Sequence, residues 1–236
     1  MIYCSNPKKQ YLSYKEEIDA AIERVLSSGK YILDQEVIKF EEEFSKFIGV
    51  NYGIGVGSGT EALHIALESC GIGPGDEVIT VSHTAVATAV GISLSGAKPV
   101  FVDIEPNFYC MDPQKIQKVI SSKTKAIVPV HLYGCPVEMD SILKIAKEKN
   151  LKVIEDCAQA HGAMLENQFV GTFGDVAALS TMYRKSIASG GSGGIVYTTN
   201  EQIYHKILSH ADRGKMLWSE DYEERNPERC LFPALK

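Results

Sequence analysis

The sequence lacks the signals of export and of membrane insertion. Residues 1–10 contain no apolar core of signal-peptide length. No later segment is long and apolar enough to cross a bilayer. The six cysteines are widely separated and form no CxxC pair, so a disulfide framework is not expected. Together these absences predict a protein of the reducing cytoplasm that does not associate with a membrane.

Several binding and catalytic signatures are also missing. The chain has 24 lysine and arginine residues against 30 aspartate and glutamate residues, and its cations are scattered, which argues against a nucleic-acid partner. The glycines at 190–194 form neither a Walker loop nor a GxGxxG fingerprint. No grouping of His, Cys and Asp has metal-ligand spacing, and nothing resembles a Ser-His-Asp triad. No metal site is therefore predicted.

Short β-branched runs that alternate with helical segments are present along most of the 236 residues. This order is typical of an α/β domain whose mostly parallel sheet is covered by helices on both faces. We expect an N-terminal helical segment, 1–50, that packs on a large domain, 51–212. The polar, aperiodic tail, 213–236, ends on an apolar stretch and reads as the start of a further region. The expected strands are 53–57, 77–81, 99–103, 126–130, 151–156, 176–181 and 194–198, and the expected helices are 14–27, 37–47, 60–67, 84–95, 113–121 and 141–149.

One carboxylate and one lysine stand out against this framework. Asp156 ends an apolar strand, so we expect its side chain in the crevice beyond the carboxyl ends of the strands, where open parallel sheets bind ligands. Lys185 lies on an aperiodic loop and is followed by four glycines within 190–194. A lysine that holds an aldehyde and an acid that pairs with a pyridine nitrogen are what a pyridoxal phosphate enzyme needs. Taken singly, a turn-capping aspartate and a solvated surface lysine remain open interpretations.

Three further positions fit the same chemistry. The turn 57–60, Gly-Ser-Gly-Thr, lies between a strand and a helix, where backbone N–H groups can approach a phosphate, although an ordinary helix cap gives the same pattern. Ser180 ends a predicted strand and can aim its hydroxyl at that phosphate. His83 lies at another strand-to-helix junction, where it can stack on a pyridine ring or simply cap the helix.

Taken together, these segments resemble the DegT/DnrJ/StrS family of sugar aminotransferases, which have the aspartate-aminotransferase type of pyridoxal phosphate fold. The stretches that carry the resemblance occur in the family's order across nearly the whole chain. They are 29–33 (GKYIL), 57–63 (GSGTEAL), 73–79 (GPGDEVI), 82–84 (SHT), 96–103 (GAKPVFVD), 129–134 (PVHLYG), 154–162 (IEDCAQAHG) and the lysine loop.

The resemblance implies a fold, a cofactor and a reaction. The fold is the large domain of this transferase class, with a mostly parallel, seven-stranded type of sheet. Lys185 matches the catalytic Schiff-base lysine, and Asp156 matches the partner of the pyridine nitrogen of pyridoxal 5′-phosphate. The reaction moves an amino group from an amino acid, L-glutamate by resemblance, to a nucleotide-linked keto-deoxysugar in amino-sugar or cell-surface polysaccharide biosynthesis. The family also implies a homodimer. The remaining implied cofactor contacts are Gly59, Thr60, His83, Gln159 and Ser180.

Two departures from the family pattern matter. Many members carry an aromatic stacking residue directly after the threonine of the 82–84 stretch, where this chain has Ala85, so stacking is expected of His83. Family members also continue into a smaller C-terminal domain, which we expect this chain to lack.

Three rival interpretations follow. A sugar dehydratase on the same scaffold has a histidine in place of Lys185. A cysteine desulfurase needs a mobile nucleophilic cysteine, and none is convincingly placed. A truncated, non-catalytic homologue with a binding or regulatory role is the alternative from a different class.

Overall fold

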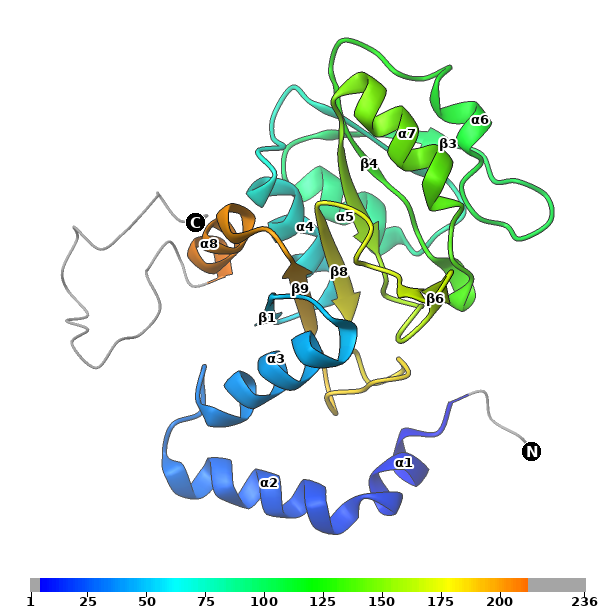
Figure 1. Ribbon diagram of the computed structural model, residues 1–236. Coiled ribbons are helices and arrows are strands. Elements are labelled where there is room, and N and C mark those ends of the chain that lie inside the picture. The colour runs from blue at the N-terminus through cyan, green and yellow to red at the C-terminus, as the bar shows by residue number, and fades with distance from the viewer. Residues whose placement is uncertain (1–4, 212–236) are drawn as a thin grey trace, which may run out of the picture.

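The computed structural model describes residues 5–211, and its centre is a sheet with helices on both faces (Figure 1). The sheet has seven strands in the order β1-β9-β8-β5-β4-β2-β3. Strands β3, β2, β4, β5 and β8 pair in parallel, and β9 runs antiparallel to both of its neighbours, β1 and β8. The predicted α/β class with a mostly parallel sheet is therefore confirmed. The strands are β1 (Tyr52–Val56), β2 (Glu77–Val81), β3 (Lys98–Val102), β4 (Thr124–Val128), β5 (Lys152–Asp156), β8 (Val176–Ser180) and β9 (Gly194–Thr198).

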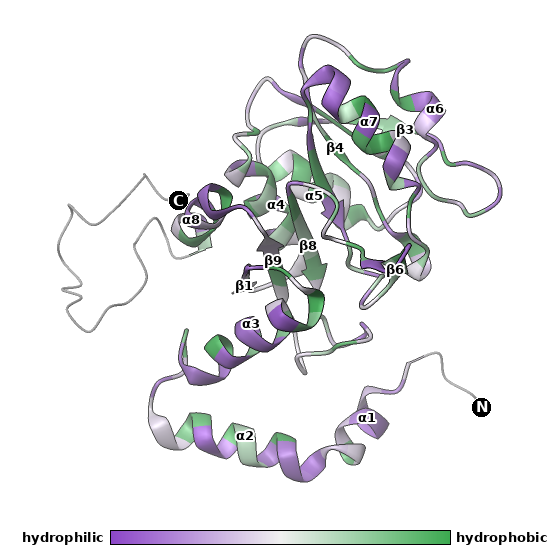
Figure 2. Ribbon diagram, viewed as in Figure 1, coloured by the Kyte–Doolittle hydropathy of each residue, from purple (hydrophilic) through white to green (hydrophobic). Residues whose placement is uncertain are grey.

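Strand β8 illustrates why the central strands are apolar at successive positions. Successive strand residues point to opposite faces, so a strand covered on both sides needs an apolar residue at every position. Val176 and Ala178 join a hydrophobic cluster with α4 (Gly59–Ser69) and α8 (Glu201–Ala211). Ala177 and Leu179 join a second cluster with α3 (Gln35–Ile48) on the other face. Figure 2 shows the hydrophobic residues concentrated on central strands such as β4 and β8.

A third hydrophobic cluster lies under the helices that follow β3 and β4. It contains Ile116 from α6 (Pro113–Ile116) and Ile142 from α7 (Met139–Lys149), packed with residues of β2, β4 and β5. On the opposite face, Ile92 of α5 (Val86–Leu94) joins the cluster that contains α4. Both faces of the sheet are thus closed to water, and its edge at the carboxyl ends of the parallel strands is left for a ligand.

That edge collects six connecting segments. Because β1 runs antiparallel to β9, it points the same way as β8 and its parallel neighbours. The segments that leave the ends of β1, β2, β3, β4, β5 and β8 therefore emerge at the same edge of the sheet. Every site residue predicted from the sequence lies on one of these segments, at the end of the strand before it, or in the first two residues of the helix after it.

The N-terminal helices differ in how they pack. Helix α3 buries Phe44, Ser45 and Ile48 against the sheet, whereas α1 (Pro7–Ser13) and α2 (Lys15–Ser28) bury no residue. In Figure 1 the latter two lie apart from the sheet at the bottom of the view. Of these three helices, only α3 therefore has side chains buried in the fold.

Other differences from the sequence prediction concern short elements. The helix expected over 113–121 ends at Ile116, and the chain continues in turns with bonds such as Val119 N to Ile116 O at 3.1 Å. The prediction omitted α1, α8, the short turn η1 (Leu132–Gly134) and a hairpin of β6 (Met164–Leu165) and β7 (Gln168–Phe169). No helix within residues 5–211 has the length and apolarity that a membrane span requires. The region expected to begin at 213 lies outside the described residues.

Candidate active site

Asp156 is the last residue of β5 and is only 4 % exposed. Its Oδ2 accepts a hydrogen bond of 2.8 Å from Thr88 Oγ1, and its Oδ1 accepts one of 3.1 Å from the Ala158 N–H. Burial raises the pKa of this carboxyl group, while the two hydrogen bonds and the positive charge of Lys185 act in the opposite direction. The structure therefore holds a desolvated carboxyl group in a fixed orientation, and a nearby positive charge would stabilise its ionised form.

Lys185 supplies part of that charge. It lies on the segment 181–193, seen below β8 and β9 in Figure 1, and its backbone N–H donates to Met182 O at 2.7 Å. The side chain is half-buried. Burial lowers the pKa of the Lys185 amine, and the Asp156 carboxylate opposes that shift. Asp156 and Lys185, 29 positions apart in the sequence, thus each influence the pKa of the other.

The turn before α4 combines a helix cap with a close backbone approach. Ser58 caps the helix by accepting a bond of 3.1 Å from the Glu61 N–H, so the plain capping interpretation is correct for Ser58. Gly59 and Thr60 begin the helix, where backbone N–H groups have no intrahelical partner and the dipole favours an anion. A Cβ on Gly59 would lie 2.6 Å from Ser180 Cβ. Glycine is required because the helix start and the end of β8 nearly touch.

Gly194, the first residue of β9, also lies close to the turn before α4. A Cβ there would lie 2.6 Å from the carbonyl oxygen of Ser58. The hydroxyl of Ser180, which is 7 % exposed, accepts a bond of 3.3 Å from the Met182 N–H. Gly59, Thr60 and Ser180, predicted to form one anion site, are thus brought together by the fold.

His83 and Gln159 lie on neighbouring segments of the same edge. The exposed His83 ring has its centroid 6.0 Å from that of Tyr133 and 6.5 Å from that of Tyr109. Gln159 Oε1 accepts a bond of 3.1 Å from the Tyr133 N–H. His83 is therefore linked to the neighbourhood of Asp156 through Tyr133 and Gln159.

The sequence reasoning missed Thr88 and His161. Thr88 on α5 is fully buried, and its hydroxyl also lies 2.8 Å from that of Thr84. His161 Nε2 lies 2.8 Å from Ser180 O, and because a carbonyl only accepts, this nitrogen carries the proton. Its buried Nδ1 has no hydrogen-bond partner among the described residues. Burial lowers the pKa of His161, and the nearby Lys185 charge lowers it further.

One buried cluster has the composition of a metal site but the bonding of a structural anchor. His131, Glu155 and Cys157 place potential ligand atoms within 4.8 Å of one another. His131 Nε2 bonds Glu155 Oε2 at 3.0 Å, and its Nδ1 accepts from the Val137 N–H at 3.1 Å. The Glu155 carboxylate also accepts three backbone N–H groups from residues 171, 173 and 174. Both ring nitrogens and both carboxylate oxygens are thus already engaged.

A model of the DegT/DnrJ/EryC1/StrS aminotransferase family matches residues 12–226. The chain belongs to this family. Among its relatives, a dTDP-3-amino-3,6-dideoxy-alpha-D-galactopyranose transaminase from Aneurinibacillus thermoaerophilus is 46% identical over 196 residues, which are 83% of this chain and 54% of that protein. A pleiotropic regulatory protein from Geobacillus stearothermophilus is 43% identical over 210 residues, 88% of this chain and 56% of that protein.

A solved family structure has the same fold. The Bacillus subtilis protein NtdA, determined with bound cofactor PMP, is 34% identical and matches with a TM-score of 0.84 over 91% of this chain and 48% of that one. The chain thus spans about half the length of the relatives it matches. Several of these relatives are named transaminases, and NtdA was determined with the cofactor PMP bound.

Proposed function

We propose that this chain is the cofactor-binding part of a pyridoxal phosphate-dependent aminotransferase. The observation that carries the proposal is the pairing of a buried carboxylate, Asp156, with a half-buried lysine of lowered pKa, Lys185, beside the anion site at the start of α4. A lysine amine is a nucleophile only when it is unprotonated, so the lowered pKa of Lys185 gives a larger fraction of reactive amine than an exposed lysine has at the same pH.

The residues present fit the cofactor. Gly59 and Thr60 at the helix start and the Ser180 hydroxyl would hold its phosphate, in a corner that a Cβ at position 59 would fill. Asp156 would pair with the pyridine nitrogen, because a cation there offsets the cost of burying the carboxylate. His83 and Gln159 would lie beside the ring. When bound, pyridoxal phosphate acts as an electron sink for the carbanion that transamination requires.

The chain's own residues then have distinct tasks. Lys185 Nζ would hold the aldehyde and, once released, would accept the proton from the α-carbon of the amino donor. Thr88 and the Ala158 N–H fix the orientation of the Asp156 carboxylate through their hydrogen bonds. His161, whose Nε2 donates to Ser180 O, would present its unpartnered Nδ1 as a hydrogen-bond acceptor.

We assign the amino acceptor to the nucleotide-linked keto sugars and the donor to L-glutamate. Support for the acceptor comes from the 46% identical relative, whose name is that of a dTDP-amino-sugar transaminase. Support for the donor is the family resemblance alone.

A homodimer is part of the same proposal. Helix α5, which carries Thr88, exposes Val86 and Leu94 by 78% and 54%, and α2 exposes Ile22 and Leu26 by 52% and 62%. Large apolar side chains exposed on these two helices offer surface for contact with another protein. A native mass of twice the chain mass is the expected result.

The decisive experiment is covalent trapping. The protein is incubated with pyridoxal phosphate, reduced with borohydride and digested, and the modified lysine is located by mass spectrometry. We expect a label on Lys185, its loss in Lys185→Ala, and its retention in Lys144→Ala, which removes an exposed lysine of α7. An unlabelled wild-type protein, or equal labelling of Lys185→Ala, would refute the proposal. Glutamate and a panel of dTDP-, UDP- and GDP-linked keto sugars then test the two halves of the reaction separately.

A regulatory role without catalysis is the second candidate. It is favoured by the 43% identical relative, which is named a pleiotropic regulatory protein. An absorbance scan with added pyridoxal phosphate separates the two, since a chain that shows no bound-cofactor band supports the regulatory role.

A further inference from the structure

Three exposed aromatic rings meet at the carboxyl edge of the sheet. His83 follows β2, Tyr109 lies between β3 and α6, and Tyr133 follows β4. The two tyrosine rings are each close to edge-on to His83, with interplanar angles of 60° and 70°. We call these three residues the aromatic wall.

The aromatic wall borders the proposed cofactor site. Tyr133 donates its backbone N–H to Gln159, three residues after Asp156. Two residues before Tyr133, the His131 N–H donates to the Asp156 carbonyl oxygen at 3.1 Å. The segment 129–134 is thus bonded directly to the strand end that carries the buried carboxylate.

Both tyrosines have a backbone conformation that disfavours a bulky side chain. Tyr109 has φ 62° and Tyr133 has φ 56°, in the left-handed region that asparagine and glycine tolerate best. Burial does not explain the choice of residue, because the two side chains are 53% and 73% exposed. Strained, exposed aromatic residues beside a site point to a role in ligand contact.

We propose that the two tyrosines of the aromatic wall, Tyr109 and Tyr133, bind the sugar-nucleotide acceptor by stacking and determine its specificity, while His83 faces the cofactor. The inference rests on the proposed transaminase function and assigns a part of the site to one of its two substrates. Stacking of a nucleobase on an aromatic ring contributes to the free energy of binding, and replacing the ring by alanine therefore lowers the affinity strongly. A dicarboxylic amino donor is instead recognised by cations. Within residues 5–211, the cation–π contacts are those of Lys15 with Tyr11 and of Arg184 with Tyr183, and none involves a ring of the aromatic wall.

The variants Tyr109→Asn and Tyr133→Asn test the proposal. Each removes a ring and relaxes the backbone strain, so the melting temperature should stay the same or rise. We expect the KM for the sugar nucleotide to increase about tenfold, the factor that corresponds to ~1.4 kcal/mol. Cofactor trapping on Lys185 and the half-reaction with glutamate should be unchanged. Tyr133→Phe, which keeps the ring, should retain most of the acceptor affinity.

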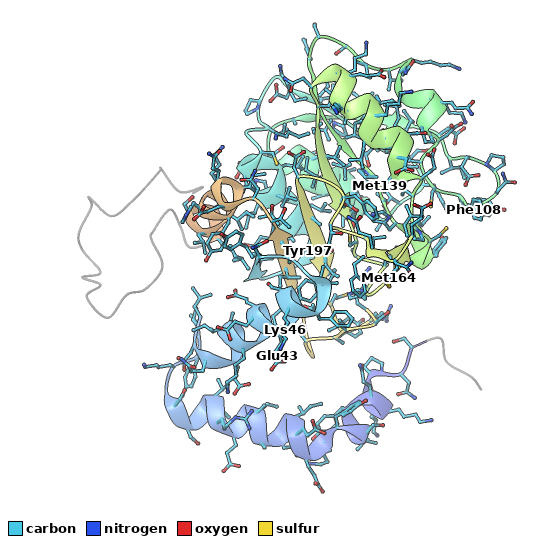
Figure 3. All side chains as sticks on the ribbon, viewed as in Figure 1. Glu43, Lys46, Phe108, Met139, Met164 and Tyr197 are labelled. Atoms are coloured by element: carbon cyan, nitrogen blue, oxygen red, sulfur yellow. The ribbon has the colours of Figure 1, made fainter. Side chains whose placement is uncertain are left out.

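Phe108→Asn is the matched control. Phe108 is the neighbour of Tyr109, is 66% exposed, and lies on the outlying loop between β3 and α6 (Figure 3). Its substitution should leave both half-reactions unchanged. The inference is overturned if the tyrosine variants keep the wild-type KM for the sugar nucleotide, if they weaken both substrates equally, or if they convert a native dimer to monomers. Failure of cofactor trapping in the wild-type protein would instead overturn the proposed function itself.

Discussion

Replacing Thr88 by valine removes a hydrogen bond to the Asp156 carboxylate and changes the side-chain shape very little. Both residues are buried, and the bond measures 2.8 Å. A hydrogen bond to a charged group contributes about 1.5–3 kcal/mol, compared with about 0.5–1.5 kcal/mol for one between neutral groups. We therefore expect Thr88→Val to lower the free energy of unfolding by about 1.5–3 kcal/mol at a pH where Asp156 is ionised.

The loss should depend on pH in a defined direction. The folded-state pKa of Asp156 is already raised by burial, so the folded protein keeps this proton to higher pH than the unfolded chain, whose aspartates titrate near pH 3.9 (approximate). The contribution of Asp156 to stability thus falls as pH rises from the unfolded pKa through the folded pKa. Loss of the Thr88 donor raises the folded pKa further and widens that window. The difference between wild type and variant should therefore be smallest near pH 4 and largest above the folded pKa.

Thr80→Val provides the matched control. Thr80 is equally buried, and its hydroxyl donates to a neutral acceptor, Val128 O, at 3.0 Å. Denaturant unfolding across pH 4 to 8 (approximate range) should give a constant difference for Thr80→Val and a rising one for Thr88→Val. Parallel, pH-independent losses in the two variants would show that Thr88 does not stabilise a charged Asp156.

Two further predictions concern the anion corner and the buried anchor. Gly59→Ala should cost about 1–3 kcal/mol of stability and weaken phosphate binding, because the new Cβ would lie 2.6 Å from Ser180 Cβ. Gly73→Ala is the control, since the atom nearest to its new Cβ is 3.8 Å away. Calorimetry and cofactor titration should both show a nearly neutral effect for this control. Glu155→Gln should cost about 3–5 kcal/mol in denaturant unfolding, since the amide NH2 would replace one carboxylate oxygen and face the backbone donors that now bond it: residues 173 and 174 at Oε1, or residue 171 at Oε2. Glu138, an exposed residue that caps α7, is the control: Glu138→Gln should cost well under half of that, and equal losses would contradict the anchor role of Glu155.

The sequence was sufficient to place Asp156 and Ser180. Both end short runs that are apolar at every position, and parallel strands present such ends at one edge. The helix α8 was within reach as well, because Ile203 and Ile207 have helical spacing after Asn200, whose side chain accepts from the Gln202 N–H at 2.9 Å.

Other parts of the site could not be read from the chain. Thr88 reaches Asp156 across 68 residues of sequence, and a threonine inside a helix carries no local sign of such a partner. The contacts of His83 with Tyr109 and Tyr133 depend on three separate loops. Positive backbone angles at two tyrosines run against residue preference, so local propensity predicts the opposite.

The antiparallel direction of β9 has a consequence for how the lysine segment can change. Because β9 returns beside β8, the segment that carries Lys185 starts and finishes one strand spacing apart, with the Thr181 N–H bonded to Gly193 O at 2.8 Å. A parallel return would have needed a crossover along the length of the sheet. Closing a loop costs only about 0.6 kcal/mol more for each doubling of its length. Insertions and deletions around the lysine can therefore accumulate while the acid on β5 stays in place, so substrate preference can diverge without rebuilding the fold.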